Sequence, residues 1–295
     1  MASFYDDIAA NKRNSYLLII AVLISVFAVL YAFTYLWLGD SFSGFAISAV
    51  LAIAYISITY SFSSQIVLSL SGAREARKNE FPYLVNVVEG LSLAAGLPTP
   101  KIYVIDDAGM NAFATGTSPE HASVAFTTGL LNAMNRAELE GVAAHEISHI
   151  KNLDSRMGTL VVVMVGLIAL ISEFGMRSMF WGRGQSGGGR DRGGGLMMLF
   201  ALVIIILAPI AAQLVRLALS RQREYLADAS GVQLTRYPPG LASALEKIKK
   251  GGAYVKAAND TTASLYFANP LSGGQLFSTH PPIEDRIRRL KEMKG

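Results

Sequence analysis

The hydrophobic positions of the chain are gathered into four long apolar runs. The first, residues 16–38, has no charged side chain over 23 positions, and the second, residues 45–70, is also uncharged. Because a helix needs about 20 apolar residues to cross the hydrocarbon layer of a bilayer, we expect these two runs to form a transmembrane hairpin. The first run is longer than the core of a signal peptide, so it is expected to persist as an anchor.

Basic residues flank this hairpin on one side only. Lys12 and Arg13 precede the first run, whereas the connection between the two runs has no Lys or Arg. The second run is followed by Arg74, Arg77 and Lys78. Since Lys and Arg are enriched on the cytoplasmic side of membrane proteins, we expect the N-terminus and the chain from residue 74 onward to face the cytoplasm.

The pattern changes to that of a water-soluble domain between residues 73 and 157. Apolar residues recur with helical spacing from Pro82 to a break at Gly96, and a proline suits the first turn of a helix. Short segments bounded by turn residues follow, and they predict three strands. These strands are expected at residues 101–105, 111–115 and 123–127.

Two further apolar runs, residues 158–176 and 196–220, enclose the glycine-rich segment 182–195, which has eight glycines in 14 positions. Such a composition packs no core and predicts a flexible loop. If both runs cross the membrane, four arginines around this loop lie outside the cell, against the tendency of basic residues to stay inside. The alternative is a hairpin tucked against the soluble domain.

The chain from residue 221 is again soluble in character, with helical spacing at residues 241–250 and 283–294. These patterns predict a mainly α fold, in which a multi-span membrane protein carries a soluble domain with a small β-sheet. The expected division is an N-terminal hairpin at 1–72, a first soluble part at 73–157, a second hairpin at 158–220 and a second soluble part at 221–295.

The composition agrees with a membrane protein. Hydrophobic residues make up 52% of the chain and charged residues only 16%, compared with about 25% charged residues in soluble proteins. The net charge of +4 comes from basic residues at the ends of apolar runs, so we expect a lipid bilayer and no nucleic acid as partner. The absence of cysteine excludes disulfides, thiolate ligands and a cysteine nucleophile. Any metal must therefore be held by histidines and carboxylates.

The candidate chemistry lies in the sequence His145-Glu146-Ile-Ser-His149, on a helix predicted to begin at a capping box of Asn135 and Glu138. Histidines four residues apart on a helix project to one side, with Glu146 beside them. Neutral imidazoles are suitable ligands for Zn²⁺. A bound zinc lowers the pKa of its water, and the carboxylate of Glu146 can accept the proton when that water attacks a peptide carbonyl. The motif indicates metal-assisted peptide hydrolysis.

A catalytic zinc usually has three protein ligands. Only His121 and His280 remain among the histidines, so a carboxylate is the expected third ligand, and His121 is predicted to be a surface residue. Glu224 is the best candidate, because Asp228 lies one helical turn later and can accept a hydrogen bond from a ligand imidazole. The alternative is a solvated helix face on which neighbouring arginines pair with these acids.

Three motifs follow one another along the chain: His145-Glu146-x-x-His149, Glu224-x-x-x-Asp228, and Ser278-Thr279-His280-Pro281-Pro282 with Asp285-Arg286. Together with the N-terminal hairpin, their order and spacing resemble the HtpX family of prokaryotic membrane zinc endopeptidases, which is related to the CAAX prenyl endopeptidases. The resemblance implies a gluzincin-like zinc protease domain with one Zn²⁺ per subunit, held by His145, His149 and Glu224. Glu146 would be the general base and then the proton donor to the leaving amine, and Asp228 would support a ligand imidazole.

The resemblance also implies roles outside the metal set. The segment similar to the family's active-site edge strand, which can pair with an extended substrate, comprises Asn111, Ala112, Phe113 and Ala114. An ordinary core strand with Phe113 packed inward is the alternative. His280 and Arg286 match the family's His-Pro and Arg positions, where they would contact substrate or donate to the oxyanion without binding metal. The alternative is a turn histidine and a solvated arginine.

These features predict a membrane-bound zinc endopeptidase of the prokaryotic inner membrane, with an active site that faces the cytoplasm. The family implies misfolded or damaged membrane proteins as substrates, in quality control and the stress response. A CAAX prenyl endopeptidase-like protease is the second reading, although an intramembrane chamber would need more than four spans. The alternative from another functional class is a non-catalytic zinc-binding membrane scaffold, which binds a structural zinc. In such a protein Glu146, beside the ligands, would have no role.

Overall fold

The computed structural model of the chain describes residues 41–163, 221–259, 262–271 and 281–293, together with separate positions between residues 13 and 35. Its helices are α2 (Ser41–Leu70), α3 (Pro82–Ala95), α4 (Thr128–Ala133), α5 (Arg136–Lys151), α8 (Arg221–Thr235), α9 (Pro238–Gly251) and α10 (Ile283–Glu292). Short 3-10 turns lie at η1 (Pro119–His121) and η3 (Ala263–Leu265). The strands are β1 (Ala73–Glu75), β2 (Lys101–Ile105), β3 (Ala112–Thr115) and β4 (Ser123–Thr127). The mainly α fold with a small sheet is as predicted.

The sheet has the strand order β1-β2-β4-β3. Strands β2 and β4 are parallel, whereas β1 and β3 run antiparallel to their neighbours. The three strands expected from the sequence are confirmed. The short strand β1 was not predicted, because three residues are too few to show an alternating pattern. Strand β3 lies at one edge of the sheet and packs against α5.

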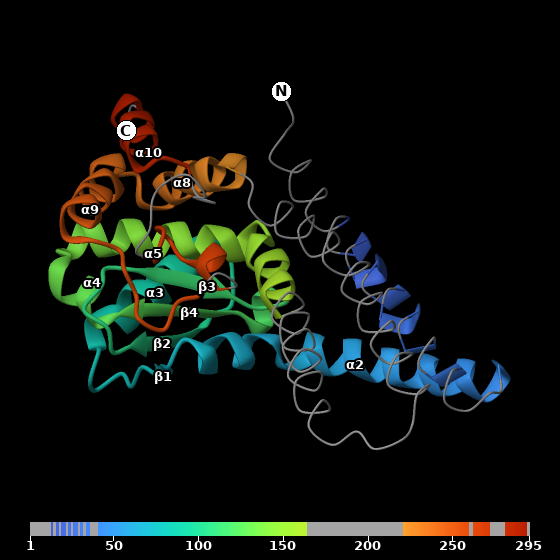
Figure 1. The fold of residues 1–295 in the computed structure, drawn as a ribbon. Helices are drawn as coiled ribbons and strands as arrows, with labels where there is room; N and C mark the ends of the chain where they lie inside the picture. The colour runs from blue at the N-terminus through green and yellow to red at the C-terminus, as the bar shows by residue number, and fades with distance from the viewer. Residues whose placement is uncertain are drawn as a thin grey trace, which may run out of the picture.

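Helix α5 is the centre of the domain and runs between the sheet and a layer formed by α8 and α9 (Figure 1). The predicted capping box at its start is confirmed: the Asn135 side chain accepts from the Glu138 N–H at 3.0 Å, and Glu138 accepts from the Asn135 N–H at 2.8 Å. Glu138 also accepts hydrogen bonds from Ser243 and Lys247 of α9, each at 2.6 Å. The start of α5 is therefore fixed both locally and to α9.

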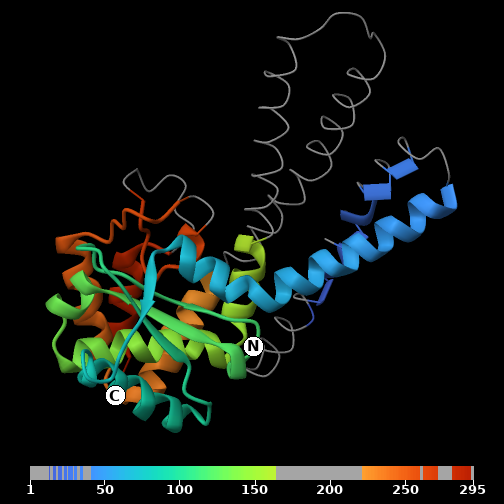
Figure 2. The same ribbon diagram turned by 90° about the horizontal axis from the view of Figure 1, so that it is seen from below.

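Helix α2 extends away from the rest of the domain, as Figure 2 shows. Within the described residues, one helix, Phe42–Leu70, is long and apolar enough to cross a membrane. Its outer part exposes large apolar side chains such as Phe45 and Val50, whereas Val67 and Leu68 are buried in a core cluster of the domain. This agrees with the second predicted run, and the helix starts four residues earlier than expected.

The rest of the predicted membrane region is described in part. The positions described within the first run are helical. Residues 154–163 form a helix that continues across the expected boundary at residue 158, and the second hairpin beyond it, with the glycine-rich loop 182–195, lies outside the described residues. The multi-span arrangement stays a prediction.

The helix at residues 154–163 joins several parts of the molecule. Met157 and Leu160 are buried beside Tyr60 of α2, while Thr159 faces the sheet. The Thr159 hydroxyl lies 2.9 Å from that of Thr115, and it accepts a hydrogen bond from the Gly116 N–H at 3.0 Å. The end of β3 is thereby tied to the segment that follows α5.

Candidate metal centre

Two imidazoles and one carboxylate converge where α5 and α8 cross. The Nε2 atoms of His145 and His149 lie 3.0 Å apart. Glu224 of α8 places its Oε2 atom 3.7 Å from Nε2 of His145 and its Oε1 atom 3.5 Å from Nε2 of His149. The potential ligand atoms of these three residues all lie within 4.8 Å of one another. The structure thus brings together the three ligands expected from the sequence.

Glycine permits the close approach of the two helices. A Cβ atom at Gly231 of α8 would lie only 3.0 Å from the backbone nitrogen of His145, which is tighter than normal packing allows. Glu224 and Asp228 precede Gly231 by seven and three residues, so all three lie on the face of α8 that packs on α5. A larger residue at position 231 would push this face, with both acids, away from the histidines.

Asp228 orients His145. The Nδ1 atom of His145 lies 2.8 Å from Oδ1 of Asp228, which leaves Nε2 directed toward Glu224. Burial opposes ionisation of Asp228, but the charge of Arg286 and the hydrogen bond with His145 outweigh it and lower the pKa of the carboxyl group. Asp228 therefore stays ionised and can accept the Nδ1–H of a neutral imidazole, which keeps the Nε2 lone pair available for a metal.

Asp154 orients His149 in the same way. Its Oδ2 atom lies 3.1 Å from Nδ1 of His149, so each candidate ligand imidazole has a carboxylate partner on its far nitrogen. The chain reaches this position through Leu153, whose φ of 60° turns it back toward α5. Asp154 was not among the residues predicted for the site. An acid in the first turn after the second histidine was the available signal.

We expect Asp154→Ala to lower the affinity for zinc by about 10–100-fold, because an imidazole without its outer partner is less basic and less well oriented. The affinity would be measured by competition with a coloured chelator. Asp285→Ala is the matched control, since Asp285 pairs with Arg288 on the partly exposed face of α10. Equal affinities for the wild type and Asp154→Ala would contradict this role.

Arg286 lies behind the ligands and is only 1% exposed. Its guanidinium donates to Asp228 through Nε at 2.9 Å and Nη2 at 2.7 Å, and to the carbonyl oxygen of Phe267 through Nη1 at 2.8 Å. These contacts make it a support for Asp228. Contact with a substrate oxyanion would require Arg286 to give up these bonds, and it stays a prediction. His280, the other predicted donor, lies outside the described residues.

The pKa values of the two histidines shift in opposite directions, although burial favours the neutral form of both. At His145 burial dominates and lowers the pKa to about 4. At His149 burial also favours the neutral form, but the carboxylates of Asp154, Glu224 and Glu146 outweigh it and raise the pKa to about 9. Metals bind neutral imidazole, so we expect metal binding to release a proton from His149.

Glu146 is the buried acid beside this cluster. It is 1% exposed, and neither carboxylate oxygen has a hydrogen-bond partner of normal geometry in the described part of the chain. Burial raises its pKa to about 8, and the charge of Glu224 adds to the effect. The backbone of Ala114 on β3 is close enough to favour the ionised form. A carboxyl group with this pKa can take up and release a proton near neutral pH, as a general base must.

The outer edge of β3 is partly paired with the chain itself. Phe113 forms an antiparallel bridge with Tyr266, and the Phe267 N–H donates to the Ala112 oxygen at 2.8 Å. Phe113 is fully buried, and its ring packs edge-on against Tyr266 at 5.1 Å between centroids. A substrate pairing along Ala112 and Phe113 would have to displace this segment. Substrate pairing at β3, including Ala114, therefore stays a prediction.

The buried side chain of Asn111 links distant segments by hydrogen bonds. Its side-chain amide donates to the carbonyl oxygens of Ala253 at 2.9 Å and Ala268 at 2.8 Å, and its Oδ1 accepts from the Ala268 N–H at 3.1 Å. These bonds hold the loop after α9 and the segment beside β3 in place. His121 is exposed in η1, as predicted, with Ser118 as its hydrogen-bond partner.

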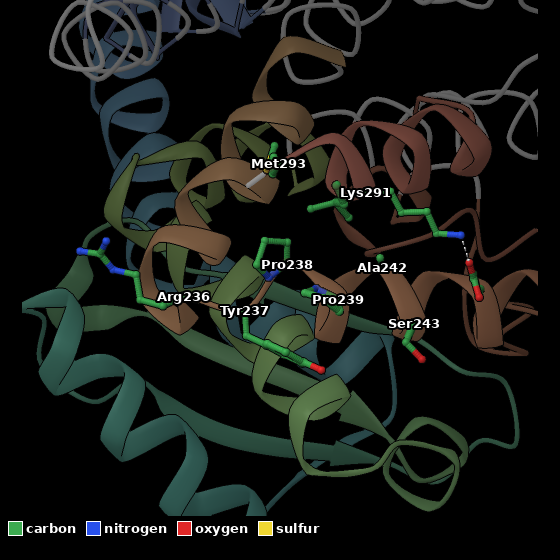
Figure 3. Close-up of a pocket in the computed structure, with 10 residues that line it drawn as sticks. Arg236, Tyr237, Pro238, Pro239, Ala242, Ser243, Lys291 and Met293 are labelled. Carbon is green, nitrogen blue, oxygen red and sulfur yellow. Dashed lines mark ion pairs between the residues drawn. The ribbon is translucent and has the colours of Figure 1, made fainter. Parts of the chain in front are cut away.

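A separate surface hollow lies between the start of α9 and the end of α10 (Figure 3). It has a volume of about 540 Å³, and its walls include Tyr237, Pro238 and Met293. Lys291 and Glu246 form an ion pair of 2.6 Å at its rim. The walls include none of the three candidate ligands, so this hollow is distinct from the metal centre.

Comparison with known proteins agrees with this geometry. The model of peptidase family M48 matches residues 78–294. A protein named Protease HtpX homolog from Dictyoglomus thermophilum is 53% identical over 294 residues, which cover 99% of this chain and 95% of that protein. Another of that name, from Streptococcus gordonii, is 43% identical over 296 residues and covers 98% and 99% of the two chains.

The fold also resembles the crystal structure of Ste24p from S. mikatae. The TM-score is 0.50 at 20% sequence identity, and the match covers 96% of this chain and 66% of that structure. The family match extends over most of the chain and contains the histidines, Glu146, Glu224 and Asp228, and the relatives match it nearly end to end. The chain is thus a membrane-bound metalloprotease that belongs to peptidase family M48.

Proposed function

We propose that this protease is a zinc-dependent endopeptidase of the cell membrane that degrades misfolded or damaged membrane proteins. The observation that carries the proposal is the convergence of two imidazoles and a carboxylate beside Glu146, a buried acid whose carboxylate has no hydrogen-bond partner of normal geometry among the described residues. This donor set suits Zn²⁺, and three protein ligands leave one coordination position for the reaction.

In this proposal His145, His149 and Glu224 hold the zinc. The bound ion supplies Lewis acidity, which lowers the pKa of water and polarises a peptide carbonyl. Glu146 accepts the proton of the attacking water and then delivers it to the leaving amine.

The residues around the ligands hold them in position. Asp228 and Asp154 fix the orientation of the two imidazoles, and Arg286 in turn fixes Asp228. We propose that His280 acts on the substrate side as an oxyanion donor. Its family position supports this role.

Substitutions at Arg286 and His280 should therefore have different effects on the enzyme. Arg286→Ala removes the buried cation that keeps Asp228 ionised, so we expect weaker zinc binding. His280→Ala should keep its zinc and lose about 2.7–4 kcal/mol of transition-state stabilisation. Zinc content and kcat/KM would be measured for both variants. Loss of zinc in His280→Ala, or full zinc affinity in Arg286→Ala, would reverse the assignment.

The position of the enzyme at the membrane supports this substrate class. Helix α2 leads within two residues into β1 of the catalytic domain, so the active site is held close to the membrane. Proteoliposomes that contain a membrane protein, either native or destabilised by mutation, would test the substrate class. We expect the destabilised form to be cleaved at least about ten times faster. Equal cleavage rates for the native and the destabilised form would contradict the proposed substrate class and leave the assignment as a zinc endopeptidase unchanged.

We further propose that the active site faces the cytoplasm and that the chain between α5 and α8 crosses the membrane twice. His149 and Glu224 must meet at one metal, so the chain between them crosses an even number of times. Because the protein has no cysteine, single cysteines at Ser186 and Ser264 can be labelled selectively. An impermeant reagent applied to intact cells should modify only the cysteine at 186. Protection of both would favour the tucked hairpin.

A further inference from the structure

A buried arginine lies outside the metal centre and has no counter-ion among the residues that the structure describes. Arg156, in the helix at residues 154–163, is 7% exposed, and its fully buried Nε atom has no hydrogen-bond partner in the described part of the chain. The described residues supply no carboxylate within ion-pair distance of it. Its guanidinium instead lies over the rings of Tyr16, at 4.7 Å, and Tyr60, at 5.8 Å. The helix that carries it, yellow-green in Figure 1, lies beside α2.

Arg156 lies next to an apolar cluster. Its neighbours on the same helix, Met157 and Leu160, pack into a cluster with Ile19 of the first apolar run and Ile56 of α2. A guanidinium has five N–H donors, and contacts with aromatic faces replace only part of the hydration that is lost on burial. The site therefore offers hydrogen-bond donors and positive charge to an anion that the described protein does not itself provide.

The length of α2 places this arginine at the level of the lipid headgroups. The helix has 30 residues and is about 45 Å long, whereas the hydrocarbon layer is about 30 Å thick, or roughly 20 residues of helix. Counted from Phe42, the hydrocarbon segment ends near Tyr60, and Val67 already belongs to the core of the catalytic domain. Tyr16 begins the first apolar run. Tyrosines are typical of the boundary between membrane and water.

We propose that Arg156 binds the phosphate of an anionic phospholipid, whose headgroup enters between the two N-terminal helices on the side of the catalytic domain. The planar guanidinium matches the geometry of phosphate oxygens, and basic pockets between membrane helices are suited to such headgroups. The lipid site is separate from peptide hydrolysis. It is nevertheless adjacent to the metal centre, because Asp154, the partner of His149, begins the same helix.

Native mass spectrometry of the full-length protein in detergent tests this proposal. Phosphatidylglycerol would be titrated against phosphatidylcholine, with inorganic phosphate as a separate arm. We expect the wild type to prefer phosphatidylglycerol and Arg156→Ala to bind it at least about tenfold more weakly, the loss typical of a charged hydrogen bond. Arg77→Ala is the matched control, because Arg77 is exposed just beyond α2 and outside the tyrosine pair, and it should keep the preference.

The wild type alone can overturn the proposal, whether or not the variant folds. Equal binding of phosphatidylglycerol and phosphatidylcholine to the wild type would contradict a headgroup site. An equal loss in Arg156→Ala and Arg77→Ala would show a diffuse attraction of the basic surface and contradict a site at Arg156. Competition by inorganic phosphate at the concentration of the lipid would show an anion site that does not require a membrane lipid, which also overturns it. Zinc content, measured in parallel, checks that each variant is folded.

Discussion

Glu146→Gln should lower the peptidase activity by at least about 100-fold while the protein keeps its metal. Glutamine has nearly the shape of glutamate but cannot accept a proton, so the variant removes the base and leaves His145 and His149 in place. The effect should be large because the other acids at this cluster, among the described residues, already have a place: Glu224 is a candidate ligand, and Asp228 and Asp154 pair with the imidazoles. Cleavage of a quenched fluorescent protein substrate and zinc content would be measured on the same preparation.

The control for this variant lies on the same helix. Glu140 is partly exposed and pairs with Arg136 at 2.8 Å, so Glu140→Gln makes the same chemical change six residues away from the site. We expect it to retain nearly full activity. A Glu146→Gln variant that cleaves at the rate of Glu140→Gln would end the assignment of Glu146 as the base.

Glu224→Ala should have the second large effect, which is loss of the metal itself. Removing an outer partner of a ligand typically weakens metal binding by 10–100-fold, so removing a ligand should weaken it by more than about 100-fold. Activity should fall in parallel and return in part at high zinc concentration. Equilibrium dialysis against buffered zinc would give the affinity, and the same samples would give the rate.

Gln222→Ala is the matched control, since Gln222 is an exposed residue on the same turn of α8. It should bind zinc as the wild type does. If Glu224→Ala also kept its zinc affinity, the third ligand would have to be another residue, and the assignment of α8 to the metal centre would be wrong.

Features that depend on residues close in the sequence could be predicted. The capping box of Asn135 and Glu138, and the projection of His145 and His149 from one helix face, follow from helical periodicity alone. The end of α3 follows from Gly96, which takes the left-handed conformation at the C-terminus of the helix, with φ of 72°.

Features that depend on the meeting of distant segments could not be predicted in the same way. Arg286 reads as one more basic residue of an amphipathic helix, yet it is buried against Asp228, 58 residues earlier. Asn111 reads as part of a strand, yet its side chain ties together loops more than 140 residues away. Strand β1 is recognised by its pairing with β2. No local pattern encodes such contacts, because they arise only when the domain is assembled.

The pairing of β3 with residues 266–267 is also a contact between distant segments, which no local sequence pattern predicts. The sequence left two readings for the segment Asn111–Ala114, an edge strand for substrate and an ordinary core strand. In the structure the burial of Phe113 fits the second reading, whereas the position of β3 at the sheet edge beside Glu146 fits the first. One strand can serve both purposes, because side chains and backbone edges point in different directions.

The most direct test of the account is metal analysis of the detergent-purified protein combined with an activity assay. We expect about one zinc per chain, cleavage of an unstructured protein, loss of both on dialysis against a strong chelator, and recovery of both when zinc is restored. A protein that cleaves at its full rate after all metal has been removed would contradict the account.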